Sequence, residues 1–343
     1  MKKAVFGILI IVLLLVVWQR ELIAYGLGQA QGQLHILLNA RPVAKVLDDP
    51  TVPDSLKQKV RLVQEIRAFA IDSLGVNDSD SYRSVYDQQG KPVLWVITAC
   101  APFSLEDKEW HFPIIGTFSY KGFFDHVEAI KQRDQLKTEG YDTGIRTVNA
   151  WSTLGIFDDP ILSSLLFRSE GSLANTVIHE LTHGTVFVKD SLKFNENLAS
   201  FIGNKGGERF LAYKYGKDSP AYQEYVAALR DRRRYSEHML RGMHALDSLY
   251  RSFTADTDTA IMLEKKQQQI RHILSQADTL SFISKKYSAL IEKLQNQPEL
   301  PNNTFFKSFA RYQASLDDFE KVYTQQFNSD LKNYLAYLKQ AYG

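Results

Sequence analysis

Residues 177–203, VIHELTHGTVFVKDSLKFNENLASFIG, restrict the fold more than any other part of the chain. The apolar residues of the first half follow a helical period and form one stripe, and His179 and His183 lie opposite it. In the second half, Glu196 shares a helix face with small residues only. Twelve residues separate His183 from Glu196. The sequence therefore predicts two helices that pack closely and are joined by a compact connection.

The spacing of the two histidines indicates a metal site. Imidazoles four residues apart on one helix lie on the same side, which suits a single Zn²⁺ ion. A catalytic zinc ion needs a third protein ligand and an open position for water, and Glu196 is the candidate for the third ligand. Glu180 flanks the histidine face, where it could accept a proton from water rather than bind the metal. We expect the first helix to be capped by Ser172 and the second by Asn195.

Composition excludes several other functions. Hydrophobic residues make up 44% and charged residues 23% of the 343 residues, as in ordinary globular proteins. The net charge of +2 gives no indication of a nucleic-acid partner, and the run Arg230–Arg234 is interpreted as a solvated helix face. The single cysteine, Cys100, lies in an apolar run, which excludes a disulfide framework and disfavours a cysteine hydrolase.

The N-terminus predicts export. Met1-Lys2-Lys3 precedes fifteen apolar residues, Ala4 to Trp18. A helix of that length spans roughly 22 Å, less than the ~30 Å hydrocarbon core, which is typical of a signal peptide. No convincing cleavage site follows, so we favour an uncleaved single-pass anchor at residues 1–20 over a removed signal. Either alternative exports the rest of the chain across the cell membrane.

Periodicity predicts an α+β region followed by a helical one. We expect a helical linker at residues 21–45, a catalytic domain at 46–207 and a helical C-terminal domain at 208–343, with the change at Gly206-Gly207. The expected elements of the middle region are helices at 55–74 (capped by Ser55) and 125–138, strands at 92–100 and 143–155, and a strand or hairpin at 114–124.

The motif and its surroundings resemble a known family. HELTH followed by NENLAS is similar to the gluzincin pattern, an HExxH motif plus a glutamate in an NExxA-type helix. More closely, the chain resembles a bacterial family of aminopeptidases, which are HExxH zinc metallopeptidases. The resemblance covers most of residues 25–325, through SYRSVY, WHFPIIGTFSYKGFFD, NAWSTLGIFDDPILSSLL, the HELTH–NENLAS stretch and LPNNTFFKSFARYQ.

This resemblance implies a fold and a set of site residues. It implies a zincin-like metallopeptidase domain, one Zn²⁺ per chain bound by His179, His183 and Glu196, and Glu180 as the general base. The chain departs from better-known gluzincins in its short connection and in Ser200, which stands where thermolysin-like enzymes carry an aspartate that orients a ligand histidine. Asn175 and Asp190 are the candidates for that orienting role.

Further residues are candidates for binding substrate. Tyr312 is the candidate donor to the oxyanion, with Tyr213 and Tyr215 as competitors. The strand through Trp151 to Gly155 is expected to form the edge of the cleft, and Asp158 with Asp159 to hold a free α-amine. The predicted substrate-binding residues are Trp151, Ser152, Thr153, Leu154, Gly155, Asp158 and Asn303.

The leading hypothesis is a membrane-tethered, exported zinc aminopeptidase that hydrolyses short peptides. The alternatives are a zinc endopeptidase, because the ligands do not distinguish exo- from endo-cleavage, and a non-catalytic envelope scaffold. Glu180 argues against the scaffold because a purely structural metal site needs no base. The sequence carries no signal for the oligomeric state.

Overall fold

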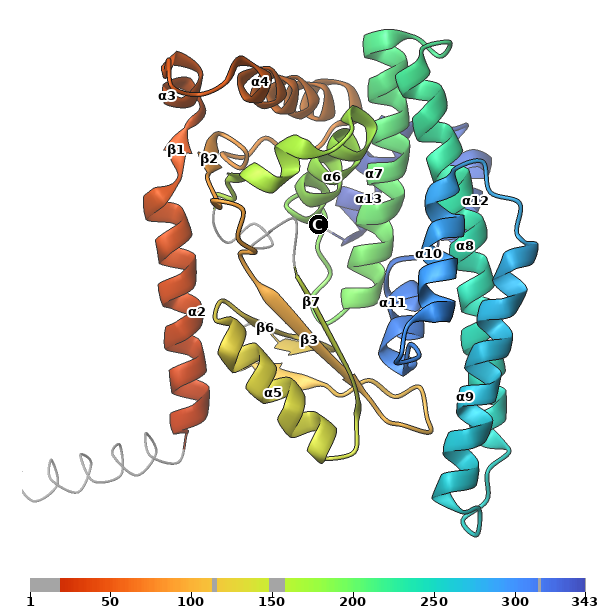
Figure 1. The fold of residues 1–343 in the computed structure, drawn as a ribbon. Helices are drawn as coiled ribbons and strands as arrows, with labels where there is room; N and C mark the ends of the chain where they lie inside the picture. The colour runs from red at the N-terminus through yellow and green to blue at the C-terminus, as the bar shows by residue number, and fades with distance from the viewer. Residues whose placement is uncertain (1–18, 113–115, 148–157, 314–315, 343) are drawn as a thin grey trace, which may run out of the picture.

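The structure is a computed structural model that describes residues 19–112, 116–147, 158–313 and 316–342 (Figure 1). It is a mixed fold in which helices outnumber strands. The helices are α2 (Arg20–Asn39), α3 (Val43–Asp48), α4 (Asp54–Phe69), α5 (His126–Thr138), α6 (Glu170–His183), α7 (Leu192–Tyr215), α8 (Pro220–Arg251), α9 (Thr259–Gln276), α10 (Lys285–Asn296), α11 (Asn303–Gln313), α12 (Leu316–Phe327) and α13 (Leu331–Tyr342). The strands are β1 (Arg41–Pro42), β2 (Ser84–Tyr86), β3 (Trp95–Cys100), β4 (Trp110–Phe112), β5 (Gly116–Phe118), β6 (Lys121–Phe123), β7 (Asp142–Thr147) and β8 (Ile161–Leu162).

The strands form three small sheets. In the first, β3 lies between β6 and β7 and pairs antiparallel with both. In the second, β2 pairs antiparallel with β1 and parallel with β8, and β4 and β5 form a hairpin. Helix α5 packs on the first sheet through Ala129 and Leu136 (Figure 1). Within the described residues β7 is an edge strand of its sheet.

Most of the predicted elements in the middle region are confirmed. The strand at 92–100 is β3, and the strand at 143–155 begins as β7, although 148–157 lies outside the described residues. Helix α5 has the expected bounds because the Asp125 carboxylate caps it, accepting from the amides of Val127 and Glu128. The predicted Ser55 cap is wrong: α4 already begins at Asp54 and ends in a π-helical turn, Ala70–Leu74.

Helices α6 and α7 form the predicted hairpin at the centre of the main core. Both begin three residues or fewer before the expected caps, so Ser172 and Asn195 lie inside the helices and do not cap them. Asn195 instead closes the connection, because its side chain donates to the Val188 carbonyl (2.7 Å) and accepts from the Val188 amide (2.9 Å). These two hydrogen bonds explain how twelve residues suffice between His183 and Glu196.

Glycine permits the close contact between α6 and α7. A Cβ at Gly203 would lie 2.8 Å from the Asn175 carbonyl oxygen and 3.1 Å from the His179 Cβ. Gly206 and Gly207 pack in the same way against Ile178 and Tyr225. Since α7 runs through both glycines without a break, the predicted change of domain after residue 207 falls inside a helix.

The region after residue 208 is helical, as predicted. Helices α8, α9, α10 and α11 share a second core that includes Met239, Leu246 and Phe306. Helices α12 and α13 return to the main core. Asp231 is fully buried and accepts from the amides of Ile283 (2.9 Å) and Ser284 (2.7 Å). The interpretation of residues 230–234 as one solvated face is therefore wrong.

Helix α2 extends along one side of the molecule (Figure 1). Its Tyr25 hydroxyl donates to the Gly122 carbonyl at 2.9 Å. The helical linker predicted at residues 21–45 is helical as far as Asn39, where α2 ends and β1 and α3 follow. Among the described helices, we find none with the length and apolar character needed to cross a bilayer. The predicted anchor at residues 1–20 lies almost wholly outside the described residues.

Cys100 is buried as expected, and burial raises the pKa of its thiol to about 12.

Replacing Gly203 with alanine tests the α6–α7 contact. Because the new Cβ meets backbone atoms, we expect Gly203→Ala to lower the free energy of unfolding by about 1–3 kcal/mol. The matched control is Gly28→Ala in α2, where a Cβ meets nothing within 4 Å, so stability should stay equal or rise by up to ~1 kcal/mol. Denaturant unfolding measures both variants, and equal stability of Gly203→Ala and wild type would contradict the packing argument.

Candidate metal centre

Three side chains converge where α6 meets the beginning of α7. The Nε2 atom of His179 lies 3.5 Å from Oε2 of Glu196, and the Nε2 atom of His183 lies 3.8 Å from the same oxygen. The ligand atoms of all three residues lie within 4.8 Å of one another. A tetrahedral zinc ion with ligands about 2.1 Å away holds them roughly 3.4 Å apart. The predicted ligand set is thus brought together at a spacing that suits a metal ion.

The two helices set this arrangement. Val177, Ile178 and Leu181 of α6 are buried in the core, which turns His179 and His183 towards α7, as the apolar stripe predicted. The histidines do not face open solvent. The side chain of His183 is only 4% exposed and that of His179 16%, because α7 covers them.

The charges of the three residues are strongly coupled. Burial opposes protonation of His179, but its hydrogen bond to Glu196 and the charges of Glu180 and Glu196 outweigh burial and raise its pKa. Burial and the neighbouring His179 lower the pKa of His183 to about 4. Burial acts to raise the pKa of Glu196, yet the hydrogen bond to His179 and the nearby positive charges lower it overall. A cation at this site would therefore meet the ionised carboxylate of Glu196 and the neutral imidazole of His183. It would displace a proton from the imidazole of His179.

The second nitrogen of each imidazole is not held as predicted. Asn175 donates to Asn204 and to the Tyr225 hydroxyl, and Asp190 accepts from the Thr117 amide, so neither orients a histidine. The Nδ1 atom of His183 is buried without a hydrogen-bond partner among the described residues. Both orienting candidates are therefore wrong, because their side chains are used elsewhere in the fold.

Glu180 lies beside the three residues in a buried polar group. Burial raises the pKa of its carboxyl to about 7, an effect that the charge of His179 counteracts and the charges of Glu196 and Asp159 reinforce. Arg168, whose guanidinium donates to the Thr176 hydroxyl, is close enough to act on the same carboxyl. Glu180 is thus a half-buried carboxyl next to a candidate metal site without being one of its converging ligands.

Sequence reasoning did not single out Tyr82, Arg168 or Arg232 as neighbours of this site. Tyr82 is 1% exposed, and the charges of Glu180, Asp159 and Arg168 act on its hydroxyl. These residues are 11 or more positions from the HELTH motif and lie outside α6, so no spacing rule joins them to it. Only SYRSVY, which contains Tyr82 and belongs to the segments that carry the family resemblance, pointed to this part of the chain.

The predicted substrate-binding residues lie in different parts of the structure. Residues 151–155 lie outside the described residues, and Asp158 directly after them is exposed. Asp159 is buried, 4% exposed, near Glu180. Asn303 is fully buried, and its amide donates to the carbonyls of a loop that begins at Ala101. The position of Asn303 therefore indicates a structural role and gives no support for contact with substrate.

The three tyrosines proposed as oxyanion donors lie at different distances from the candidate metal site. Tyr213 and Tyr215 lie at the far end of α7, about 25 Å or more along the helix from Glu196, which rules them out as donors at this site. Tyr312 lies in the last turn of α11, and its side chain is outside the described part. The backbone carbonyl of the preceding residue, Arg311, accepts a hydrogen bond from the Asn197 side chain at 2.6 Å. This turn of α11 therefore adjoins the residue after Glu196.

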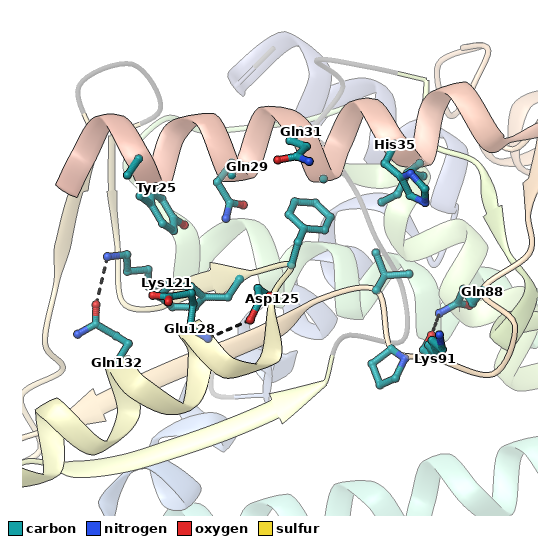
Figure 2. A pocket seen from close by; sticks show the side chains of 18 of the residues that line it. Tyr25, Gln29, Gln31, His35, Gln88, Lys91, Lys121, Asp125, Glu128 and Gln132 are labelled. Atoms are coloured by element: carbon teal, nitrogen blue, oxygen red, sulfur yellow. Dashed lines mark hydrogen bonds between the residues drawn. The ribbon is translucent and has the colours of Figure 1, made fainter. Parts of the chain in front are cut away.

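A cavity of about 1150 Å³ is found elsewhere, between α2 and the sheet carrying α5. Figure 2 shows that Tyr25, Gln29 and His35 of α2 face it from one side and Lys121 and Glu128 from the other. None of the residues at the candidate metal centre lines it. The chemistry proposed below does not involve this cavity.

Removing the carboxylate ligand tests the metal site. Glu196→Ala should lower zinc affinity at least about 100-fold, because loss of a direct ligand should exceed the roughly 10- to 100-fold effect of an outer partner. The control is Glu224→Ala, which removes an exposed carboxylate on α8. Zinc content after dialysis measures the effect, and equal zinc in both variants would remove Glu196 from the ligand set.

Zinc affinity should also depend on pH. A histidine must be deprotonated to bind a metal, and the pKa of His179 lies above its usual value. Protons therefore compete with zinc near neutrality, so affinity should rise from about pH 6 to about pH 8, by up to roughly tenfold per unit. Titration against a chromophoric chelator measures this, and an affinity that is constant over this range would be inconsistent with ligation by His179.

Comparison with known proteins gives one match. The family model described as "Putative aminopeptidase" matches residues 24–342, which include the three converging residues and Glu180. Neither the curated proteins nor the solved structures contain a match to the chain. Because the family model covers nearly the whole sequence, the chain belongs to the "Putative aminopeptidase" family.

Proposed function

We propose that this chain is a zinc-dependent aminopeptidase with a zincin-like catalytic domain. His179, His183 and Glu196 would hold the ion, and Glu180 would be the general base. The observation that carries the proposal is the convergence of two imidazoles and one carboxylate beside a second, half-buried carboxyl that is not one of the converging ligands. Membership of the family supports peptidase activity at a coarse level.

The residues around the ion divide the chemistry among them. A bound zinc ion would polarise the scissile carbonyl and lower the pKa of water towards ~7. Glu180 would accept the proton of the attacking water and deliver it to the leaving amine. A carboxyl whose pKa lies near 7 suits both transfers, because a general acid–base group works best near the operating pH. Arg168 and Tyr82 would hold Glu180 in place and exclude water from it.

The edge strand β7 supports a binding mode for the peptide. The Asn302 side chain donates to the Thr143 carbonyl (2.9 Å), so α11 covers the beginning of the strand. Arg146 and Thr147 at its end are exposed, and the charge of Arg146 acts on Glu196. A peptide that adds to this end as a further strand would lie beside the metal ligands.

Asp159 favours exopeptidase over endopeptidase action. It is a buried carboxylate near the general base, and a free α-amine is the substrate group that such a carboxylate binds well. An endopeptidase has no need for a negative charge at this position, and an envelope scaffold has no need for Glu180. The apolar run of residues 4–18 supports tethering to the cell membrane with the catalytic part exported.

Substitution of the general base tests the proposal. Glu180→Gln should retain zinc and lose nearly all hydrolysis, by about 100-fold or more, because general-base catalysis typically contributes about 10²–10⁴-fold. Glu224→Gln on the exposed face of α8 is the control and should retain both. Zinc content and hydrolysis of short peptides are measured on the same samples. Full activity of Glu180→Gln would refute the mechanism.

A second comparison distinguishes the two kinds of peptidase. Peptides with a free N-terminus should be cleaved much faster than their N-acetylated forms, because acetylation removes the positive charge that Asp159 would bind. Equal cleavage of both would favour the endopeptidase. Absence of both zinc and cleavage would favour the scaffold.

A further inference from the structure

Arg232 lies on the face of α8 that packs against α6. It is seven residues, about two turns, beyond Tyr225 and therefore on the same face. Tyr225 is buried, and its hydroxyl accepts from the Asn175 side chain at 2.9 Å. Asn175 precedes His179 by one turn of α6. Arg232 consequently lies alongside the histidines, and its charge, together with burial, counteracts the rise in the pKa of His179.

Arg232 is a half-buried cation without an acidic partner. Its neighbour Arg233 pairs with Glu237 at 2.9 Å and with Asp317 at 2.6 Å. Over the parts of the chain that the structure describes, Arg232 makes neither a hydrogen bond nor an ion pair. A guanidinium stays charged at any physiological pH, and partial burial of an unpaired charge is unfavourable. A bound anion would remove this unfavourable state.

Arg232 and Glu180 lie on opposite flanks of the metal site. At about 100° per residue, Asn175 is rotated roughly 60° from the centre of the His179–His183 pair, and Glu180 roughly 80° the other way. Asn175 marks the α8 side, which carries Arg232. Figure 1 shows α6 between β2 and the helices α7 and α8. The Glu180 flank carries Arg168 as well as Glu180, and Arg232 on the other flank adds a further positive charge, which also acts on Arg168.

Charges near the site leave room for an anion. Three arginines act electrostatically on the buried acidic and histidine side chains, and they match three carboxylates in number. These are Arg146, Arg168 and Arg232 against Asp159, Glu180 and Glu196. A divalent cation would give the site a positive excess, which favours a substrate that carries a negative group near the scissile bond.

We propose that Arg232 binds the C-terminal carboxylate of the substrate, which makes di- and tripeptides with free ends the preferred substrates. This inference rests on the proposed peptidase function. A helix with its side chains is about 10 Å across, and an extended peptide of two or three residues spans at most roughly 7–11 Å. In the proposed mode, such a peptide would place its amine at Asp159 on one flank and its carboxylate at Arg232 on the other. A longer peptide would place its carboxylate beyond Arg232.

The test compares free-acid and amidated peptides in the zinc-loaded full chain. Wild type should hydrolyse trialanine with a KM roughly 10- to 100-fold below that of trialanine amide, the range expected for a hydrogen bond to a charged group. Arg232→Gln should raise the KM of the free acid by that factor, leave the amide unchanged and change kcat little. Arg232→Lys should recover part of the preference. Arg230→Gln, on the exposed side of the same helix, should behave as wild type.

A binding measurement keeps this inference separate from the peptidase proposal. Calorimetry with the zinc-loaded Glu180→Gln protein should show tighter binding of trialanine than of its amide, and addition of Arg232→Gln should abolish the difference. That result would support the carboxylate site even if the wild-type protein hydrolyses no peptide. Absence of hydrolysis would refute only the proposed peptidase function. Equal KM and equal binding for acid and amide in wild type would overturn the inference. So would an Arg232→Gln variant, folded by circular dichroism, that weakens both peptides equally.

Discussion

The contact between α6 and α7 at Gly203 is the constraint on which the candidate site depends. The absence of a side chain there lets the backbone of α7 approach the Asn175 carbonyl and the His179 Cβ. This approach brings the Glu196 carboxylate to both imidazoles. A wider separation by even one methyl group would move the third ligand away from the other two. The position of the site is therefore a consequence of backbone packing in the core.

The rest of the fold holds this hairpin from several sides. Val177, Ile178 and Leu181 fix the rotation of α6 against the main core, and α8 is locked to α6 by Tyr225. Asn303 at the start of α11 joins the loop after β3 to the Tyr250 hydroxyl of α8. Lys266 of α9 contributes a buried ion pair with Asp142 at 2.5 Å, which ties the helical region to the start of β7. The helical C-terminal region thus forms part of the wall around the site.

Buried charge distinguishes this site from an ordinary polar core. Glu180, Asp159, Arg168 and Tyr82 share a small volume in which burial raises the pKa of both Glu180 and Tyr82. Such arrangements reduce stability unless they serve binding or catalysis, because ionised groups lose hydration there. The half-buried guanidinium of Arg232 on the other flank is likewise a charged group that has lost part of its hydration. In the proposed reading, a zwitterionic peptide held across a metal ion places its amine at Asp159 and its carboxylate at Arg232.

The sequence alone identified the two helices, their facing sides, the three converging residues and Glu180, because these follow from helical periodicity over short distances. It also predicted β3, α5 and the helical region after residue 208. It placed the caps of α4, α6 and α7 a few residues too late. It read Asp231 as solvated, although that residue is buried by α10, and it gave Asn303 a role in binding that its burial does not support. Such assignments depend on partners far along the chain. Tyr82, Arg168 and Arg232 come to this site only through tertiary packing, since separations of 11 to 97 residues from His179, between different parts of the fold, leave no periodic signal in the sequence.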